Sequence, residues 1–224
     1  DPIPTAAVEH VAAGAVGSLA LDDVPDGGEM AVGVGSRGIA NLPRIVRGVV
    51  SGLDARGYDP FVFPAMGSHG GATADGQRAK LDALGVSAAS VGCEIRATMS
   101  VTEVGRTPEH DLPVVTDANA AAADAIVPIN RVKPHTNSSG RVESGLSKML
   151  TVGLGKRPGA QAFHEAAATH GYVDTIERAL DVVRANAPVV GGVAAVENFH
   201  DRTAAIEGVP AARLPDAETA LLDR

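Results

Sequence analysis

The stretch EMAVGVGSRGIANLPRIVRGVVSGLDARGYDPFVFP, residues 29–64, decides the fold class of this chain. Its opening segment, 29–35, is a short apolar run of the kind that forms a buried strand. Over 41–56, apolar residues recur three or four positions apart, which predicts a helix with one apolar face and with Asn41 as its N-cap. The next apolar run, 60–64, predicts a second strand.

The same alternation continues along the chain. Thr73 is a suitable N-cap for a helix that runs to about Leu84, and a single apolar face predicts another helix over 172–187. Later strands are predicted at 112–116, 124–130 and 189–196. Strands that alternate with helices favour parallel pairing through right-handed crossovers. We therefore expect one α/β domain over 1–224, with a doubly wound, mostly parallel, Rossmann-like sheet and helices on both faces.

Composition excludes several classes of function. The net charge is −8 and aromatic residues make up 3%, so neither the basic stripe nor the stacking platform of a nucleic-acid surface is visible. No apolar run reaches the roughly 18 residues of a membrane span, and no signal segment opens the chain. The single cysteine, Cys93, excludes an internal disulfide and a thiolate metal cluster. We expect a cytoplasmic protein that acts on small molecules.

Three polar loops follow predicted strands: 35–41, 66–73 and 130–148. Because ligands of doubly wound sheets bind outside the carboxyl ends of the strands, we expect these loops to converge on one site. Glycines in the first loop let the backbone approach a ligand, and Arg37 offers a planar fork for a carboxylate or a phosphate. An ordinary turn with a solvated arginine is equally consistent with this spacing.

Two histidines lie in the other loops. His69 is surrounded by Ser68, Gly70 and Gly71, and these small neighbours leave its imidazole accessible to a ligand. With an ordinary pKa of about 6.5, such a histidine can act as an acid or a base near neutrality. A histidine that only hydrogen-bonds a turn carbonyl is the alternative. His135 follows a proline that fixes the chain just after a predicted strand.

Further cations follow the strand predicted at 124–130. Arg131 and Lys133 crowd its end, which is unusual for a loop with only a structural role. Lys148 has small and apolar neighbours, conditions that lower the pKa of a lysine and make its amine nucleophilic. His164 lies early in a helix that we expect to begin after Pro158, and by itself it reads as an ordinary histidine.

Taken in order, these motifs resemble the N-terminal domain of the nickel-pincer-nucleotide lactate racemase family, as a divergent subgroup. The resemblance covers about 31–164. It rests on a histidine in a glycine-rich loop, a Pro-His pair after a later strand, a Ser-Gly-x-x-Lys motif, and a histidine 16 residues beyond that lysine. The chain departs from the family pattern at Val34, where the type enzymes have an acidic residue, and in a longer segment before Lys148.

The resemblance implies a racemase or epimerase of a 2-hydroxyacid and gives each residue a role. Lys148 would bind the nickel-pincer nucleotide, and His164 would be the protein ligand to nickel. His69 and His135 would be the paired acid/base groups that serve the two enantiomers. Arg37 would hold the substrate carboxylate.

The remaining residues of the predicted site would contact the cofactor. These are Ser68, Gly70, Gly71 and Lys133, with Arg131 as a further cation suited by its charge to a phosphate. In the family the active site lies between this domain and a smaller C-terminal domain. The chain begins at Asp1 without a methionine, and 216–224 reads as an interrupted helix. We therefore expect the N-terminal part of a longer two-domain enzyme; its oligomeric state, its hydroxyacid and the activity of this part alone stay open.

Two other functions remain open at this point. In the first, His69, His135 and His164 are three ligands to a zinc-type metal that activates water for hydrolysis, which leaves Lys148 unexplained. In the second, the chain is a non-catalytic module that binds a nucleotide or an anion through its first two polar loops. Substitution of the two loop histidines would then leave binding nearly intact.

Overall fold

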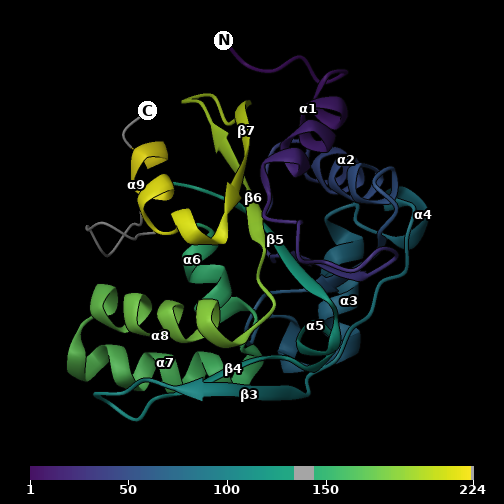
Figure 1. Cartoon of the computed structure of the whole chain (residues 1–224). Helices are drawn as coiled ribbons and strands as arrows, with labels where there is room; N and C mark the ends of the chain where they lie inside the picture. The colour runs from purple at the N-terminus through teal and green to yellow at the C-terminus, as the bar shows by residue number, and fades with distance from the viewer. Residues whose placement is uncertain (134–143, 223–224) are drawn as a thin grey trace.

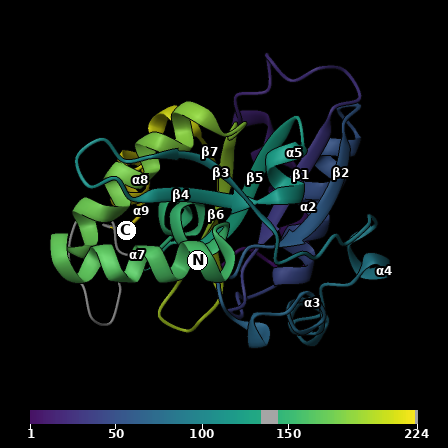
Figure 2. The same cartoon turned by 90° about the horizontal axis from the view of Figure 1, so that it is seen from below.

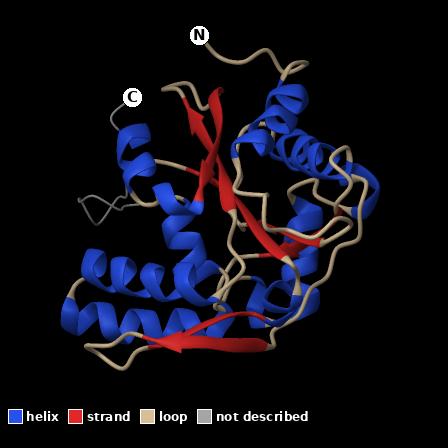
Figure 3. Ribbon diagram, viewed as in Figure 1, coloured by secondary structure: helices blue, strands red, loops and turns tan. Residues whose placement is uncertain are grey.

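The computed structural model of the chain describes residues 1–133 and 144–222. Five strands form the central sheet, in the order β2–β1–β5–β6–β7. The pairs β1–β2, β1–β5 and β5–β6 are parallel, and β7 is antiparallel to β6. The strands, drawn in red in Figure 3, are β1 (Glu29–Val34), β2 (Asp59–Pro64), β5 (Ala125–Arg131), β6 (Gly191–Glu197) and β7 (Thr203–Pro210).

Helices cover both faces of this sheet, as predicted. Figure 1 shows α1 and α2 on one side of the strands and α6, α8 and α9 on the other. The helices are α1 (Val8–Ala15), α2 (Leu42–Asp54), α3 (Ala74–Ala83), α4 (Ala88–Val91), α5 (Ala118–Ala122), α6 (Leu146–Lys148), α7 (Lys156–His170), α8 (Tyr172–Asn186) and α9 (Asp216–Leu222). This is a mixed α/β, Rossmann-like fold. Nowhere in the described ranges is a helix long and apolar enough to cross a membrane.

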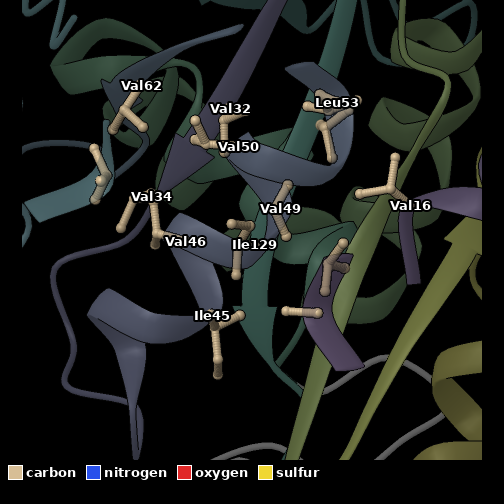
Figure 4. Close-up of a cluster of buried hydrophobic side chains, with 14 of the residues drawn as sticks. Val16, Val32, Val34, Ile45, Val46, Val49, Val50, Leu53, Val62 and Ile129 are labelled. Carbon is tan, nitrogen blue, oxygen red and sulfur yellow. The ribbon is translucent and has the colours of Figure 1, made fainter. Parts of the chain in front are cut away.

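Two buried clusters of apolar side chains hold the layers together. Along β1, Val32 and Val34 point to one face, and Ala31 packs on the other. Figure 4 shows the two valines of β1 beside Val46 and Val49 of α2. Each fully buried aliphatic side chain of this kind stabilises the fold by about 1.5–3 kcal/mol. The spacing that predicted the apolar face of α2 therefore corresponds to the surface that packs on the sheet.

A second, two-stranded sheet lies apart from the first. It pairs β3 (Val101–Arg106) with β4 (Pro113–Asp117) in antiparallel fashion, and it packs against α7 and α8 (Figure 2). The strand predicted at 112–116 is therefore real, but it does not join the main sheet as we expected. Neither β3 nor β7 was predicted, because these edge strands bury one side at most and show no continuous apolar run.

The two predicted helix caps differ in outcome. Thr73 caps α3, since its Oγ1 accepts a hydrogen bond of 3.1 Å from the backbone N–H of Gly76. Asn41 stands at the N-cap position of α2 but makes no capping bond; its Nδ2 donates instead to Thr203 Oγ1 at 2.9 Å. Its positive φ of 61° turns the loop after β1 toward β7. This contact fixes the loop that carries Arg37.

Candidate active site

The strand order reverses at β1, because β2 lies on one side of it and β5 on the other. Such a switch point leaves a crevice outside the carboxyl ends of the strands, where ligands of this fold class bind. A pocket of about 270 Å³ lies there, walled by the loops after β1 and β2, the end of β5 and the segment from α6 to α7. The serine, histidine and charged residues that line it are Ser36, Arg37, Ser68, His69, Ser144, Lys148 and His164.

The structure thus brings together five of the nine residues predicted for the site: Arg37, Ser68, His69, Lys148 and His164. Gly70, Gly71 and Lys133 do not line this pocket. His135 lies outside the described residues, so its place as the second acid/base group stays a prediction. The convergence of three loops that are far apart in sequence is what the fold class predicted.

Gly70 and Gly71 have a structural explanation. Both have positive φ, 66° and 65°, in the turn that leads into α3. A Cβ on Gly70 would lie 2.6 Å from the backbone of Gly76, so only glycine fits this close approach. Their predicted contact with a cofactor is not needed to account for these glycines, and it stays a prediction.

His69 is held at the pocket by a hydrogen bond between its Nδ1 and Ser36 Oγ, and its backbone N–H donates to Met66 O at 3.1 Å. Partial burial lowers the pKa of the imidazole, and the nearby charge of Arg37, followed by those of Lys80 and Lys148, lowers it further. The neutral imidazole therefore dominates at neutral pH. When Nδ1–H donates to Ser36, Nε2 is free to accept a proton.

Lys148 ends α6, next to a π-helical turn over Met149–Gly153. Its ammonium lies 5.5 Å from the centroid of the Tyr172 ring, within the range of a cation–π contact. Burial lowers the pKa of this amine, and the charges of Arg37 and Lys133 add to the effect. A lowered pKa is what the small and apolar neighbours of this lysine predict.

We predict that acylation of Lys148 has a pH midpoint below the ordinary lysine value of about 10.4. The Arg37→Gln variant removes a cation that lowers this pKa, so the midpoint should rise. Rates measured by peptide mapping and mass spectrometry across pH would show both effects. Arg44→Gln, a matched change of an exposed arginine on α2, should leave the midpoint in place. A midpoint at or above that of an ordinary lysine would contradict the assignment.

Glu218 of α9 fixes the segment that carries Lys148. The side chain is buried, and its carboxylate accepts hydrogen bonds from the backbone N–H groups of Leu146 and Ser147 and from Ser147 Oγ. These donors begin α6, where a carboxylate also meets the positive end of the helix. Burial raises the pKa of this carboxyl, whereas the hydrogen bonds act in the opposite direction. Nothing in the sequence pattern pointed to Glu218.

Glu218→Gln is expected to lower the free energy of unfolding by about 1–3 kcal/mol. The amide nitrogen of glutamine cannot accept a hydrogen bond, so at least one of the donors at Leu146 and Ser147 loses its acceptor. Chemical denaturation of the variant measures this loss. Asp23→Asn, at an exposed acidic residue, should stay within about 0.5 kcal/mol of the unsubstituted chain. Equal stability of the two variants would show that Glu218 does not hold α6.

His164 lies in the middle of α7 and on the pocket wall. The helix begins at Lys156, before the start expected after Pro158. Pro158 lies in its first turn, where the missing N–H of a proline removes no hydrogen bond within the helix. The ring of Phe163 meets the imidazole edge-on at 5.7 Å between centroids. Across 1–133 and 144–222, no three His, Cys, Asp or Glu side chains cluster as a metal site would require. Within these residues, His164 is therefore not part of a three-residue metal site.

Arg131 has a partner within the fold. Its guanidinium pairs with Glu197 of β6, and the second carboxylate oxygen of Glu197 accepts a hydrogen bond of 2.5 Å from the backbone N–H of Ala40. This bridge joins β5, β6 and the loop after β1. The charge of Arg131 is thereby accounted for without a phosphate.

Comparisons with known proteins bear on the fold of this chain. No family model and no curated protein sequence matches the chain. Among solved structures, it is similar to the lactate racemase apoprotein from Thermoanaerobacterium thermosaccharolyticum, with a TM-score of 0.68 at 12% sequence identity. The match covers 95% of this chain and 54% of the racemase chain, so this chain spans about half the length of that protein. The likeness shows a shared fold.

Proposed function

We propose that this chain is the cofactor-holding domain of a racemase or epimerase that acts on a 2-hydroxyacid. One observation carries the proposal: Arg37, His69, Lys148 and His164 line a single pocket at the switch point of the sheet. The fold that this pocket belongs to is shared with a lactate racemase apoprotein. The sequence motifs predict the same four residues as parts of one site.

The residues of the pocket fit a nickel-pincer nucleotide. Lys148 supplies an amine with a lowered pKa for attachment, and His164 supplies one imidazole as a nickel ligand. A single protein ligand suffices when the remaining donors come from the cofactor. When bound, the cofactor would reversibly accept a hydride from C2 of the hydroxyacid.

The protein groups would perform the proton transfer and the positioning. Arg37 would bind the substrate carboxylate through its planar guanidinium. His69, neutral because of burial and its cationic neighbours, would accept the hydroxyl proton and later return it. His135 would do the same for the opposite enantiomer. Further substrate contacts would come from a second domain of the full-length protein.

The direct test is racemisation by the full-length protein, produced together with the enzymes that make the cofactor. Single enantiomers of a panel of 2-hydroxyacids are incubated with it and separated by chiral chromatography. The proposal predicts that at least one acid gains its mirror image. If no acid in the panel changes configuration, and if wild type and His69→Ala bind carboxylates equally well, the chain is instead an anion-binding module.

A further inference from the structure

A fully buried lysine lies directly behind the pocket. Lys156 begins α7, and its side chain is 0% exposed. Its Nζ lies 2.5 Å from Pro64 O, 3.0 Å from Gln77 Oε1 and 2.8 Å from Asp117 Oδ2. An ammonium has three N–H donors and no acceptor; Pro64 O and Gln77 Oε1 accept hydrogen bonds from it, and the Asp117 carboxylate balances its charge. The lysine therefore joins the ends of β2 and β4 to α3 and α7.

This ammonium sets the direction of the Gln77 side chain. Because Lys156 can only donate, the oxygen of the Gln77 amide must face it, and the nitrogen must face the other way. Gln77 Nε2 then donates to Gly67 O at 2.8 Å and to His69 O at 3.2 Å. Gln77 is itself 0% exposed, so water cannot replace these bonds without opening the fold.

The two carbonyls held by Gln77 flank Ser68 in the loop after β2. Gly67 has a positive φ of 57°, and its N–H donates to Gly153 O at 2.9 Å, which anchors the start of the loop to the π-helical turn. The far end of this short segment is the backbone of His69. Gln77 therefore fixes the loop on both sides of the exposed residue Ser68, and so fixes the backbone position from which the His69 side chain extends.

We propose that Gln77 is a positioning residue for His69 and that the buried Lys156–Asp117 pair holds the Gln77 amide in its working orientation. The role in catalysis rests on the proposed function, in which His69 is the base. The positioning itself rests on the hydrogen bonds alone. It extends the site inward, to residues that do not line the pocket.

Gln77→Met tests the proposal, since methionine keeps the side-chain length and removes both donors. The imidazole of His69, faced by Arg37, Lys80 and Lys148, is followed by NMR titration in the 224-residue chain. Release of the loop into solvent should move its pKa up toward about 6.5. Ala79→Ser, an exposed change on the same helix, should leave the titration unchanged. In the cofactor-loaded full-length protein, kcat should fall about 10²-fold, with a smaller change in KM.

Gln77→Glu provides a second variant. It keeps an acceptor for Lys156, but a carboxylate oxygen replaces the Nε2 group that donates to Gly67 O and His69 O. The same rise in the pKa of His69 is expected. A folded variant of either kind with an unchanged His69 titration would overturn the positioning role. Absence of racemisation by wild type would overturn the proposed function alone, since the titration is read without turnover.

Discussion

His69→Ala is expected to lower kcat for racemisation by about 10²–10⁴-fold, the usual contribution of a general acid/base group. The imidazole is hydrogen-bonded to Ser36 and is kept neutral by burial and by its cationic neighbours, so it is ready to accept a proton. Steady-state kinetics of the cofactor-loaded full-length protein measure the loss. His10→Ala, at an exposed histidine of α1, is the matched control and should retain full activity.

The pH profile makes this assignment more specific. Because the pKa of His69 is lowered, the acidic limb of kcat/KM should lie below 6.5, and activity should fall as pH drops through that limb. Lys80 lowers this pKa from outside the pocket, so Lys80→Ala should move the limb to higher pH with little change in kcat. If the acidic limb stays in place in Lys80→Ala, or if His69→Ala keeps the wild-type kcat, His69 is not the acid/base group of the reaction.

Lys156→Met is expected to lower the free energy of unfolding by about 3–5 kcal/mol. The substitution leaves the Asp117 carboxylate, whose side chain is 0% exposed, without the ammonium that lies 2.8 Å away. The backbone N–H groups of Asn119 and Ala120 would remain as its donors through Oδ1. An isolated buried charge of this kind is costly, whereas the intact pair is compensated. Chemical denaturation of the chain measures the difference.

The double variant Lys156→Met/Asp117→Asn separates the charge from the packing. Removal of both charges should recover part of the stability that the single variant loses, because no uncompensated ion remains. The recovered fraction reports how much of the loss came from the unpaired carboxylate. If Lys156→Met alone stays within about 1 kcal/mol of wild type, the pair does not hold the fold together as described.

The regular elements of the main sheet were predictable because their residues are buried in periodic patterns. β1, β2, β5 and α2 carry continuous or helically spaced apolar residues, and the structure confirms them. The position of the pocket followed from the same patterns, since parallel strands present their carboxyl ends at one edge. In the edge strands β3 and β7 the alternation of polar and apolar residues is too irregular to predict a strand from the sequence.

The supports behind the site could not be predicted, because they depend on contacts between distant segments. Glu218 meets the start of α6 across 72 positions, and Lys156 meets Pro64 across 92. A buried lysine and an exposed one look alike in a sequence. At Asn41 the sequence correctly predicts the N-cap position of α2, but the side chain bonds Thr203 and does not cap the helix.

Intact-mass and metal analysis of the full-length protein, produced together with the cofactor-making enzymes, shows directly whether the protein holds a nickel-pincer nucleotide. We expect nickel together with a cofactor-sized adduct or a tightly bound chromophore, lost in Lys148→Ala and retained in the matched variant Lys80→Ala. Loss of nickel with retention of the organic group is expected for His164→Ala. Protein purified without metal, adduct or chromophore under these conditions would show that the pocket does not hold this cofactor.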